Sequence, residues 1–346
     1  MTKRVLHVTE AYAGGVQTAI QDYVRNTSDE YHHYLAYAFR ENASLDSLQT
    51  FTESYHLPDG HFARIGYIRH LAKANAYDVI HAHSSFAGVY ARLAVPQARK
   101  HIVYTPHAYS FIRRDIPLWE KSVFYLFEFS LSHRTCIYAC CSPHEATLTR
   151  RFPLTSHRVY VVPNAARGQE SVSLFSGADP HMCMIGRLSN QKDPVFFRDC
   201  WEKILETFPK ATATWYGDGD VEYRHILESS GVKVTGWLSF EQIRNDIMTK
   251  PSVYLHSALW EGFPISLLEM AQLGIPIVVR RIPAFEDCDI PVLVNKPEEI
   301  TNAISSFTNP IFIRDVAHRI LLGHSDSDQR AALEQVYSSV GGNPNS

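Results

Sequence analysis

Two carboxylates, Glu261 and Glu269, lie eight residues apart in an otherwise apolar stretch, SALWEGFPISLLEMAQLGIP at residues 257–276. The run SVYLHSA predicts a strand and Pro264 favours a helix start, which places Glu261 in a loop and Glu269 in a helix. Ionised carboxylates accept hydrogen bonds from hydroxyl groups, such as those of a sugar, more strongly than amides do. The alternative is a helix-entry glutamate followed by an ordinary surface glutamate.

Two cations, Arg187 and Lys192, follow another predicted strand in the segment IGRLSNQKDP. Asp193-Pro194 marks the start of the next helix, so both cations lie near a helix N-terminus, where backbone amides attract anions. A fork-shaped guanidinium beside a compact ammonium suits a diphosphate, especially where no divalent metal takes part. The alternative is a pair of solvated surface cations.

Two glycines, Gly14 and Gly15, separate a predicted strand from a helix in the segment TEAYAGGVQTAI. Glycines at a helix N-terminus let backbone amides approach an anion such as a phosphate closely. A tight strand-to-helix turn without a ligand explains the same two residues.

Three histidines lie at predicted strand ends, in the segments IHAHSS and YTPHAYSF. We assign His81 and His83 to opposite faces of their strand, which would keep them from chelating one ion, and we predict no metal site. His107 follows Pro106 at the carboxyl end of a strand, so it is the better candidate for a functional residue.

The elements that must position these residues are short apolar runs that alternate with helical stretches. In the first half they are RVLHVTE, HHYLAYAF, YDVIHAHS, KHIVYTP, TCIYACCS and RVYVVPN. After a polar break at residues 164–178 the pattern restarts with MCMIGRL, ATATWYGDG, VKVTGW, SVYLHSA, IPIVVRR and IPVLVNK. Such alternation is typical of doubly wound α/β domains, which bind ligands beyond the carboxyl ends of their strands. A chain of 346 residues suits two such domains of about 150 residues each.

Composition excludes several classes of protein. The balance of 33 Lys+Arg against 36 Asp+Glu gives a net charge of −3, which argues against a nucleic-acid partner. The six cysteines lack paired metal-ligand spacing, and we interpret them as reduced thiols of a cytosolic protein. We find no signal-peptide pattern and no apolar run of membrane-spanning length.

The motifs together resemble the retaining glycosyltransferases of family 4, which have the GT-B fold. The resemblance is carried by GRLSNQK and by SALWEGFPISLLEMAQLGIPIVV, in which Glu261 and Glu269 match the family's E-x7-E pattern. It extends to GGV, DVIHAHS, TPHAY, ACCSPHEA and VYVVPNA, and so to most of the chain. It implies an α/β protein of two Rossmann-like domains that face each other across a cleft.

The resemblance also implies domain boundaries. Residues 1–165 would form an acceptor domain and residues 166–324 a nucleotide-sugar donor domain. Residues 325–346 would hold a helix that crosses back to the first domain, followed by a loose tail.

The same resemblance implies roles for the candidate residues of the donor site. Arg187 and Lys192 would bind the donor diphosphate and stabilise it as a leaving group. Glu261 and the amides of Gly262 and Phe263 would hold the transferred sugar.

Further residues of the family pattern complete the expected site. Glu269 would bind the nucleotide ribose, His107 would face the sugar, and Gly14-Gly15 would approach the phosphate. The sequence departs from the family where Ala165 and Pro264 replace frequent glycines; Pro264 cannot donate a backbone N–H.

The expected reaction is transfer from a nucleotide-diphosphate sugar, with a UDP-sugar as the expected donor and neither a metal nor a cofactor. We expect same-face substitution with retention, because no residue is an obvious covalent nucleophile. Two alternatives stay open: a UDP-sugar 2-epimerase, and a non-catalytic module of the same fold.

The acceptor is expected on the N-terminal domain, where Arg113 and Arg114 precede the aromatic segment LWEKSVFYLFEFSL. A basic, aromatic helix can lie on an anionic membrane, but burial against the sheet explains the same aromatics. With membrane contact, the protein would be peripheral on the inner face of the plasma membrane. Its acceptor would then be a lipid-linked saccharide of bacterial surface polysaccharide synthesis. Otherwise a soluble sugar or metabolite would be the acceptor.

Overall fold

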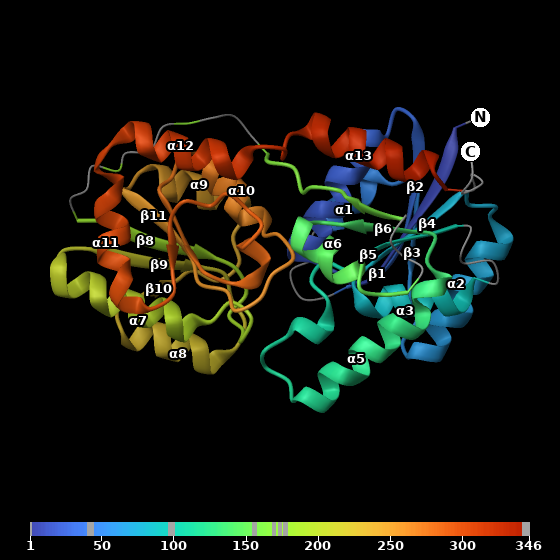
Figure 1. Cartoon of the computed structure of the whole chain (residues 1–346), viewed down its shortest axis with the longest axis horizontal. Coiled ribbons are helices and arrows are strands. Elements are labelled where there is room, and N and C mark those ends of the chain that lie inside the picture. The colour runs from blue at the N-terminus through green and yellow to red at the C-terminus, as the bar shows by residue number, and fades with distance from the viewer. Residues whose placement is uncertain are drawn as a thin grey trace. The chain divides into compact units, whose positions relative to one another are not determined.

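The computed structural model describes residues 2–39, 45–95, 101–153, 158–167, 171, 175 and 179–340. The chain divides into two compact units (Figure 1). Unit 1 comprises Met1–Ala165 together with the segment that begins at Gly323, and unit 2 comprises Ala166–Leu322. Most of the predicted break at residues 164–178 lies outside the described residues.

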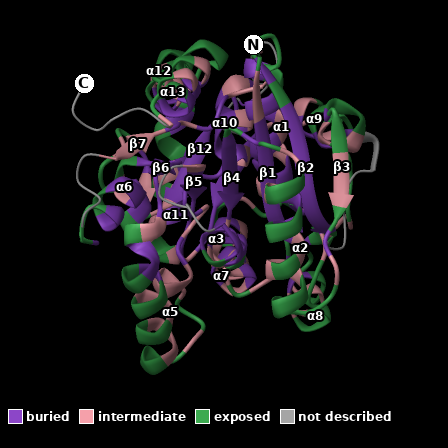
Figure 2. Ribbon diagram, turned by 90° about the vertical axis from the view of Figure 1, so that its right-hand side faces the viewer, coloured by how far each residue is buried: buried purple, intermediate pink, exposed green. Residues whose placement is uncertain are grey.

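The core of unit 1 is a parallel sheet of seven strands in the order β3-β2-β1-β4-β5-β6-β7. The strands are β1 (Lys3–Tyr12), β2 (Tyr31–Phe39), β3 (Glu53–His56), β4 (Val79–His83), β5 (Ile102–Thr105), β6 (Ile137–Cys140) and β7 (Val159–Val161). Central strands are buried on both faces, as is typical of a parallel sheet covered by helices (Figure 2).

The helices of unit 1 are α1 (Gly14–Thr27), α2 (His61–Ala74), α3 (Ser85–Ala94), α5 (Leu118–Leu131), α6 (Pro143–Thr149) and α13 (Asp326–Ser338). The last of these comes from the end of the chain and packs against α1 (Figure 1). Asn26 Nδ2 donates to Gln329 Oε1 at 2.8 Å, and Gln329 Nε2 donates to the Pro163 carbonyl at 2.8 Å. Leu333 and Val336 are fully buried in the same hydrophobic cluster as Val5 and Tyr23.

Helix α5 is anchored by the hydrogen bonds of its buried residue Glu128 and is exposed along much of its surface. Glu128 accepts hydrogen bonds from Arg92 (2.9 Å) and Tyr104 (2.9 Å), and the Arg92 guanidinium also lies over the Tyr104 ring. Six large apolar side chains of the helix are exposed: Leu118, Trp119, Val123, Leu126, Phe127 and Phe129. Burial against the sheet therefore does not explain these six side chains (Figure 2).

Unit 2 is built around a parallel sheet of six strands in the order β10-β9-β8-β11-β12-β13. The strands are β8 (His181–Ile185), β9 (Thr212–Tyr216), β10 (Lys233–Val234), β11 (Ser252–His256), β12 (Ile277–Arg280) and β13 (Leu293–Val294). The helices are α7 (Pro194–Thr207), α8 (Val221–Ser229), α9 (Phe240–Met248), α10 (Ile265–Gln272), α11 (Ile300–Ser305) and α12 (Pro310–Leu321).

The predicted strands all form, and one further strand was not predicted. Strand β3 has only four residues, none of them fully buried, and it lies at the edge of its sheet, so it lacks the apolar run by which the others are recognised. Pro264 is the residue before α10 rather than the first residue within it. Among the described residues, the structure contains no helix long and apolar enough to cross a bilayer.

Candidate active site

In unit 2 the candidate residues follow two neighbouring strands. Strands β8 and β11 pair in parallel, with Cys183 opposite Tyr254, so the loops after their carboxyl ends emerge side by side. Two hydrogen bonds connect the loops. Leu259 N donates to the Gln191 carbonyl at 2.8 Å, and Ser257 Oγ donates to the Lys192 carbonyl at 2.6 Å. The sheet order therefore brings together residues about seventy positions apart.

Lys192 and Glu261 form the central contact of this cluster. The Lys192 ammonium lies 2.5 Å from Glu261 Oε1, and both side chains are largely buried, at 17% and 9% exposure. Burial by itself would raise the pKa of Glu261, but the nearby Lys192 charge and hydrogen bonding from His256 outweigh it and lower that pKa to about 2. Glu261 is therefore ionised at neutral pH.

His256, at the end of β11, is a member of the cluster that sequence reasoning did not identify. Its Nε2 lies 3.4 Å from Glu261 Oε1, and its Nδ1 lies 3.1 Å from the Tyr254 hydroxyl. Burial lowers the pKa of His256, which keeps the ring neutral. The signal for it was available, since a histidine at the carboxyl end of a strand directly before SALWEG meets the same criterion as His107.

The loop that carries Lys192 is held in place by its neighbours. Asp193 adopts a left-handed conformation, caps α7 by accepting from Phe196 N at 3.1 Å, and pairs with Arg280 at 2.5 Å. A Cβ atom at Gly186 would lie 3.1 Å from Lys192 Cε, so the lysine stem passes closely over a position where glycine leaves room. The Lys192 side chain is thus confined before any ligand binds.

The other predicted donor-site residues surround this pair to different degrees. Gly262 and Phe263 are buried next to Glu261, Glu269 is half-buried in α10, and Arg187 is exposed after β8. Helix α10 begins after Pro264, which provides no side-chain cap, so amides of the first turn have no side-chain acceptor from that position.

In unit 1 the predicted residues lie at the carboxyl ends of β1, β4 and β5. Gly14 has φ +52°, and a Cβ atom at Gly14 or Gly15 would have open space around it. Helix α1 starts after Ala13 without a side-chain cap and without an acidic residue in its first turn. Its N-terminus is thus suited to an anion.

His107 occupies a strained loop after β5. His107 and Ala108 both have positive φ, 51° and 75°, which is uncommon for residues other than glycine. The Ala108 amide donates to Glu145 Oε1 at 2.8 Å, and the Cys141 amide donates to Glu145 Oε2 at 2.9 Å. The buried Glu145 carboxylate thereby holds the strained loop, which gives a physical role to the glutamate in ACCSPHEA.

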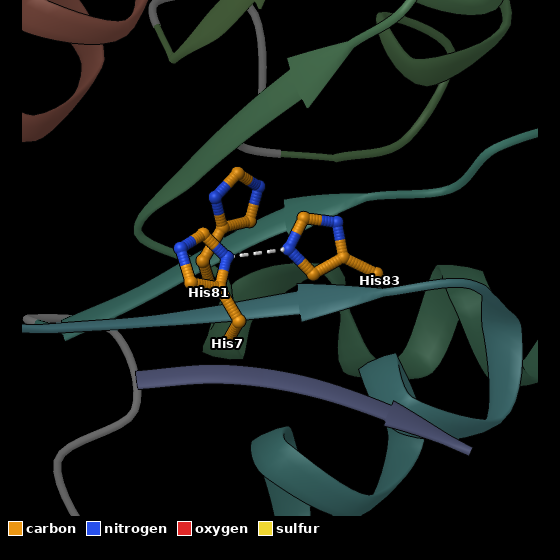
Figure 3. A group of neighbouring side chains, drawn as sticks. All are labelled: His7, His81 and His83. Atoms are coloured by element: carbon orange, nitrogen blue, oxygen red, sulfur yellow. Dashed lines mark hydrogen bonds between the residues drawn. The ribbon is translucent and has the colours of Figure 1, made fainter. Parts of the chain in front are cut away.

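The prediction that His81 and His83 face opposite ways is wrong. Residues two apart in a strand share a face, and their ring centroids lie 4.1 Å apart (Figure 3). His7 of β1 joins them, and the three offer nitrogen atoms within 4.8 Å of one another. His7 Nδ1 lies 2.9 Å from His83 Nε2, which is a hydrogen-bond contact (Figure 3). His83 Nδ1 in turn lies 3.1 Å from His107 Nε2.

Arg113 and Arg114 precede α5 as expected but differ in environment. Arg113 forms a two-pronged ion pair with Asp115 at 2.8 and 3.0 Å, whereas Arg114 is exposed. Arg114 is therefore the more accessible of the two for an anionic group of an acceptor.

Comparison with known proteins connects both units to one class of enzyme. Residues 13–166 match the family described as Glycosyltransferase Family 4, and residues 179–309 match the family described as Glycosyl transferases group 1.

Relatives and solved structures agree with these matches. An uncharacterized 41.2 kDa protein in the cps region of Klebsiella pneumoniae is 23% identical over 308 residues, 82% of each chain. The UDP-Gal:alpha-D-GlcNAc-diphosphoundecaprenol alpha-1,3-galactosyltransferase of Escherichia coli is 25% identical over 240 residues, 61% of this chain and 60% of the relative. The lipopolysaccharide outer core galactosyltransferase WaaB superposes with a TM-score of 0.68 at 15% identity, covering 97% of this chain and 99% of the other. The chain therefore belongs to the glycosyltransferases of GT-B fold, with a family 4 domain followed along the sequence by a group 1 domain.

Proposed function

We propose that this glycosyltransferase transfers a sugar with retention from a UDP-sugar to a lipid-linked saccharide, without a metal, in the synthesis of a bacterial surface polysaccharide. The observation that carries the proposal is the buried Lys192–Glu261 pair at the carboxyl ends of β8 and β11. It places a cation suited to phosphate and a carboxylate suited to sugar hydroxyls at one point of the donor unit.

The diphosphate would be bound by cations and by helix N-termini. Lys192 is already confined, and the exposed Arg187 follows the same strand. Phosphate oxygens would compete with Glu261 for the Lys192 ammonium, and the released carboxylate would accept hydrogen bonds from the transferred sugar. Since negative charge grows on the diphosphate as it leaves, donors aimed at it stabilise the transition state, by roughly 3 kcal/mol for a well-placed donor.

The remaining donor contacts follow the family pattern. Glu269 of α10 would accept from the ribose hydroxyls, and the amides of Gly262 and Phe263 would contact the sugar. In unit 1, His107 would bind a sugar hydroxyl, and the amides at Gly14-Gly15 would bind phosphate.

The chemical step we propose is substitution on one face of the sugar. The bond from the anomeric carbon to the phosphate oxygen breaks, and the bond to the acceptor oxygen forms on the same side. The acceptor proton passes to the departing phosphate oxygen, so no enzyme nucleophile is needed. Isolation of a covalent glycosyl-enzyme would overturn this step.

The acceptor class is inferred from α5 and from the relatives. Six exposed apolar side chains on one 14-residue helix are suited to the interfacial region of a bilayer, where a lipid-linked substrate would lie. The relative from E. coli is named for a diphosphoundecaprenol acceptor, and the relative from K. pneumoniae is named for a cps region. The name of the E. coli relative supports a polyprenol-linked acceptor.

The first test of the donor assignment is a thermal-shift panel in EDTA with UDP, GDP, ADP, CMP and their sugars. A ligand that binds only the folded state raises the melting temperature, by an amount that depends on its concentration relative to Kd. We expect UDP and UDP-sugars to stabilise the wild type, and to stabilise Glu269→Ala less.

Product analysis then separates the possible reactions. Release of UDP and a new glycoside only when a polyprenol-linked saccharide is added supports the transferase. An epimerase would release UDP from a UDP-sugar without any acceptor. Failure of every nucleotide to shift the melting temperature would contradict the donor site and favour a non-catalytic protein.

A further inference from the structure

A line of imidazole rings leads from the half-buried His107 to three fully buried histidines in the interior of unit 1. Each ring contacts the next through one nitrogen on either side. The contacts are His107 Nε2 to His83 Nδ1 (3.1 Å), His83 Nε2 to His7 Nδ1 (2.9 Å), His7 Nε2 to His33 Nδ1 (3.0 Å) and His33 Nε2 to Thr27 Oγ1 (3.0 Å). We call these four histidines with Thr27 the imidazole chain; His7 and His83 are drawn in Figure 3.

Every ring of the imidazole chain is neutral at physiological pH. Burial lowers the pKa of His33 and of His107 to about 4, and lowers the pKa of His7 and His83 well below the ordinary value. A neutral imidazole has one N–H donor and one bare nitrogen that accepts. The contacts can therefore all point one way or all point the other way, and the two directions place the His107 proton on different nitrogens.

Thr27 at the inner end selects the direction. Its hydroxyl lies 2.6 Å from the Tyr23 carbonyl oxygen, and a carbonyl can only accept, so the hydroxyl proton is used there. Thr27 Oγ1 must then accept from His33, which requires the proton of His33 on Nε2. Following the contacts outward, each ring donates from Nε2 and accepts at Nδ1.

We propose that Thr27, His33, His7 and His83 are positioning residues that hold His107 as its Nε2–H tautomer and leave its Nδ1 as a hydrogen-bond acceptor for a substrate hydroxyl. Within the part of the chain that the structure describes, Nδ1 of His107 has no hydrogen-bond partner. The substrate contact rests on the proposed function, whereas the tautomer does not.

The inner end of the chain also excludes a role in proton conduction. The last acceptor is the Tyr23 backbone carbonyl, which cannot take up a proton and pass it to solvent. The imidazole chain therefore sets the donor and acceptor roles of His107 and does not remove protons from it. A neutral His107 is suited to accept a hydroxyl proton in a hydrogen bond, not to act as an acid.

The test is two-dimensional 15N–1H NMR of the ligand-free protein labelled with 15N-histidine, which distinguishes the two tautomers of each ring. We expect His7, His33, His83 and His107 of the wild type as Nε2–H tautomers. Thr27→Val removes the hydroxyl that accepts from His33 without adding volume, so the fraction of His107 in the Nδ1–H tautomer should rise about fivefold to tenfold, as for one lost hydrogen bond. Thr27→Ser keeps the hydroxyl and should retain the wild-type tautomers.

Three results would overturn the proposal. One is His107 of the wild type with its proton on Nδ1, and another is an unchanged His107 tautomer in Thr27→Val with His33 still folded in place. A stoichiometric metal at His7, His81 and His83 would also overturn it, and would appear as metal in the purified protein and as 15N shifts that change when a chelator removes it.

Activity provides a second readout in the same variants. With a UDP-sugar and an acceptor, Thr27→Val should lower kcat severalfold while Thr27→Ser keeps it. His81→Gln is the matched control for loss of a buried β4 histidine, because the His81 nitrogens contact Tyr337 and Thr105, and its ring packs against His83 without being a hydrogen-bonded member of the imidazole chain. If no donor is turned over by the wild type, the proposed function fails while the NMR result still decides the tautomer.

Discussion

The residue with the most informative charge state is Glu261, because its folded pKa of about 2 lies well below the ordinary value of 4.5. A lowered carboxyl pKa contributes stability that is fully present above about pH 4.5 and is lost as the pH falls toward 2. Each tenfold change in proton affinity corresponds to about 1.4 kcal/mol, so this difference in pKa corresponds to about 3 kcal/mol. The source of this stability is the Lys192 charge held at 2.5 Å.

We therefore predict that Glu261→Gln lowers the free energy of unfolding by about 3 kcal/mol at pH 7, and that this deficit shrinks by about 1.4 kcal/mol by pH 3.5. Urea unfolding monitored by tryptophan fluorescence measures both values, because Trp201, Trp215, Trp237 and Trp260 all lie in unit 2. The control is Asp199→Asn, in a partly exposed pair with Arg198, which should cost little at either pH. A pH-independent deficit for Glu261→Gln would contradict the ion-pair account.

At the scale of elements, α5 combines firm attachment with an apolar surface. Leu118 and Trp119 are 79% and 69% exposed, so they add little to folding but could add membrane affinity. We predict that Leu118→Ser with Trp119→Ser lowers partitioning onto anionic phospholipid vesicles at least tenfold, because each apolar side chain contributes roughly 1.5–3 kcal/mol when buried. Vesicle co-sedimentation measures the change, and the melting temperature should remain near that of the wild type.

A matched control for this helix exists in the same unit. Phe62 of α2 is 91% exposed, and Phe62→Ser should leave vesicle binding unchanged if α5 alone meets the bilayer. Equal losses from Phe62→Ser would point to non-specific adsorption. If the wild type does not bind vesicles, the membrane role of α5 is contradicted, and its apolar surface would instead contact a soluble acceptor or another protein.

For the whole molecule, the end of the chain stabilises its beginning. Helix α13 buries Leu333 against the core of unit 1, and Arg25 of α1 pairs with Asp326 at 2.6 Å. We predict that Leu333→Ala costs about 2–5 kcal/mol, the range for a buried leucine replaced by alanine. Hydrogen exchange should become faster in β1 and α1 and stay unchanged in unit 2.

The control for this prediction is Ile311→Ala, on α12 of unit 2, where the side chain is 74% exposed. It should leave exchange unchanged in both units. Faster exchange throughout unit 2 in Leu333→Ala would show that α13 stabilises the chain by a route other than its packing in unit 1.

The amino-acid pattern by itself determined the two α/β sheets, because parallel strands buried on both faces appear as short apolar runs whatever surrounds them. It also located Lys192 and Glu261 in loops after strands, where ligands bind in such sheets. The GT-B class could be recognised for a related reason, since E-x7-E and GRLSNQK occupy fixed places after strands. Strand β3 was not predicted, because a short edge strand lacks the apolar run by which the other strands are recognised.

Only the tertiary structure decided which residues meet. His256 approaches Glu261 within one loop, but His7, His33 and His83 come from three strands, and sheet order alone makes them neighbours. Thr27 lies at the end of a helix, where no sequence pattern suggests a link to His107. The direction in which the imidazole chain donates its hydrogen bonds depends on the 2.6 Å contact between the Thr27 hydroxyl and the Tyr23 carbonyl. Hydrogen bonds between residues distant in sequence form only when the protein has folded, so the sequence alone did not reveal this direction.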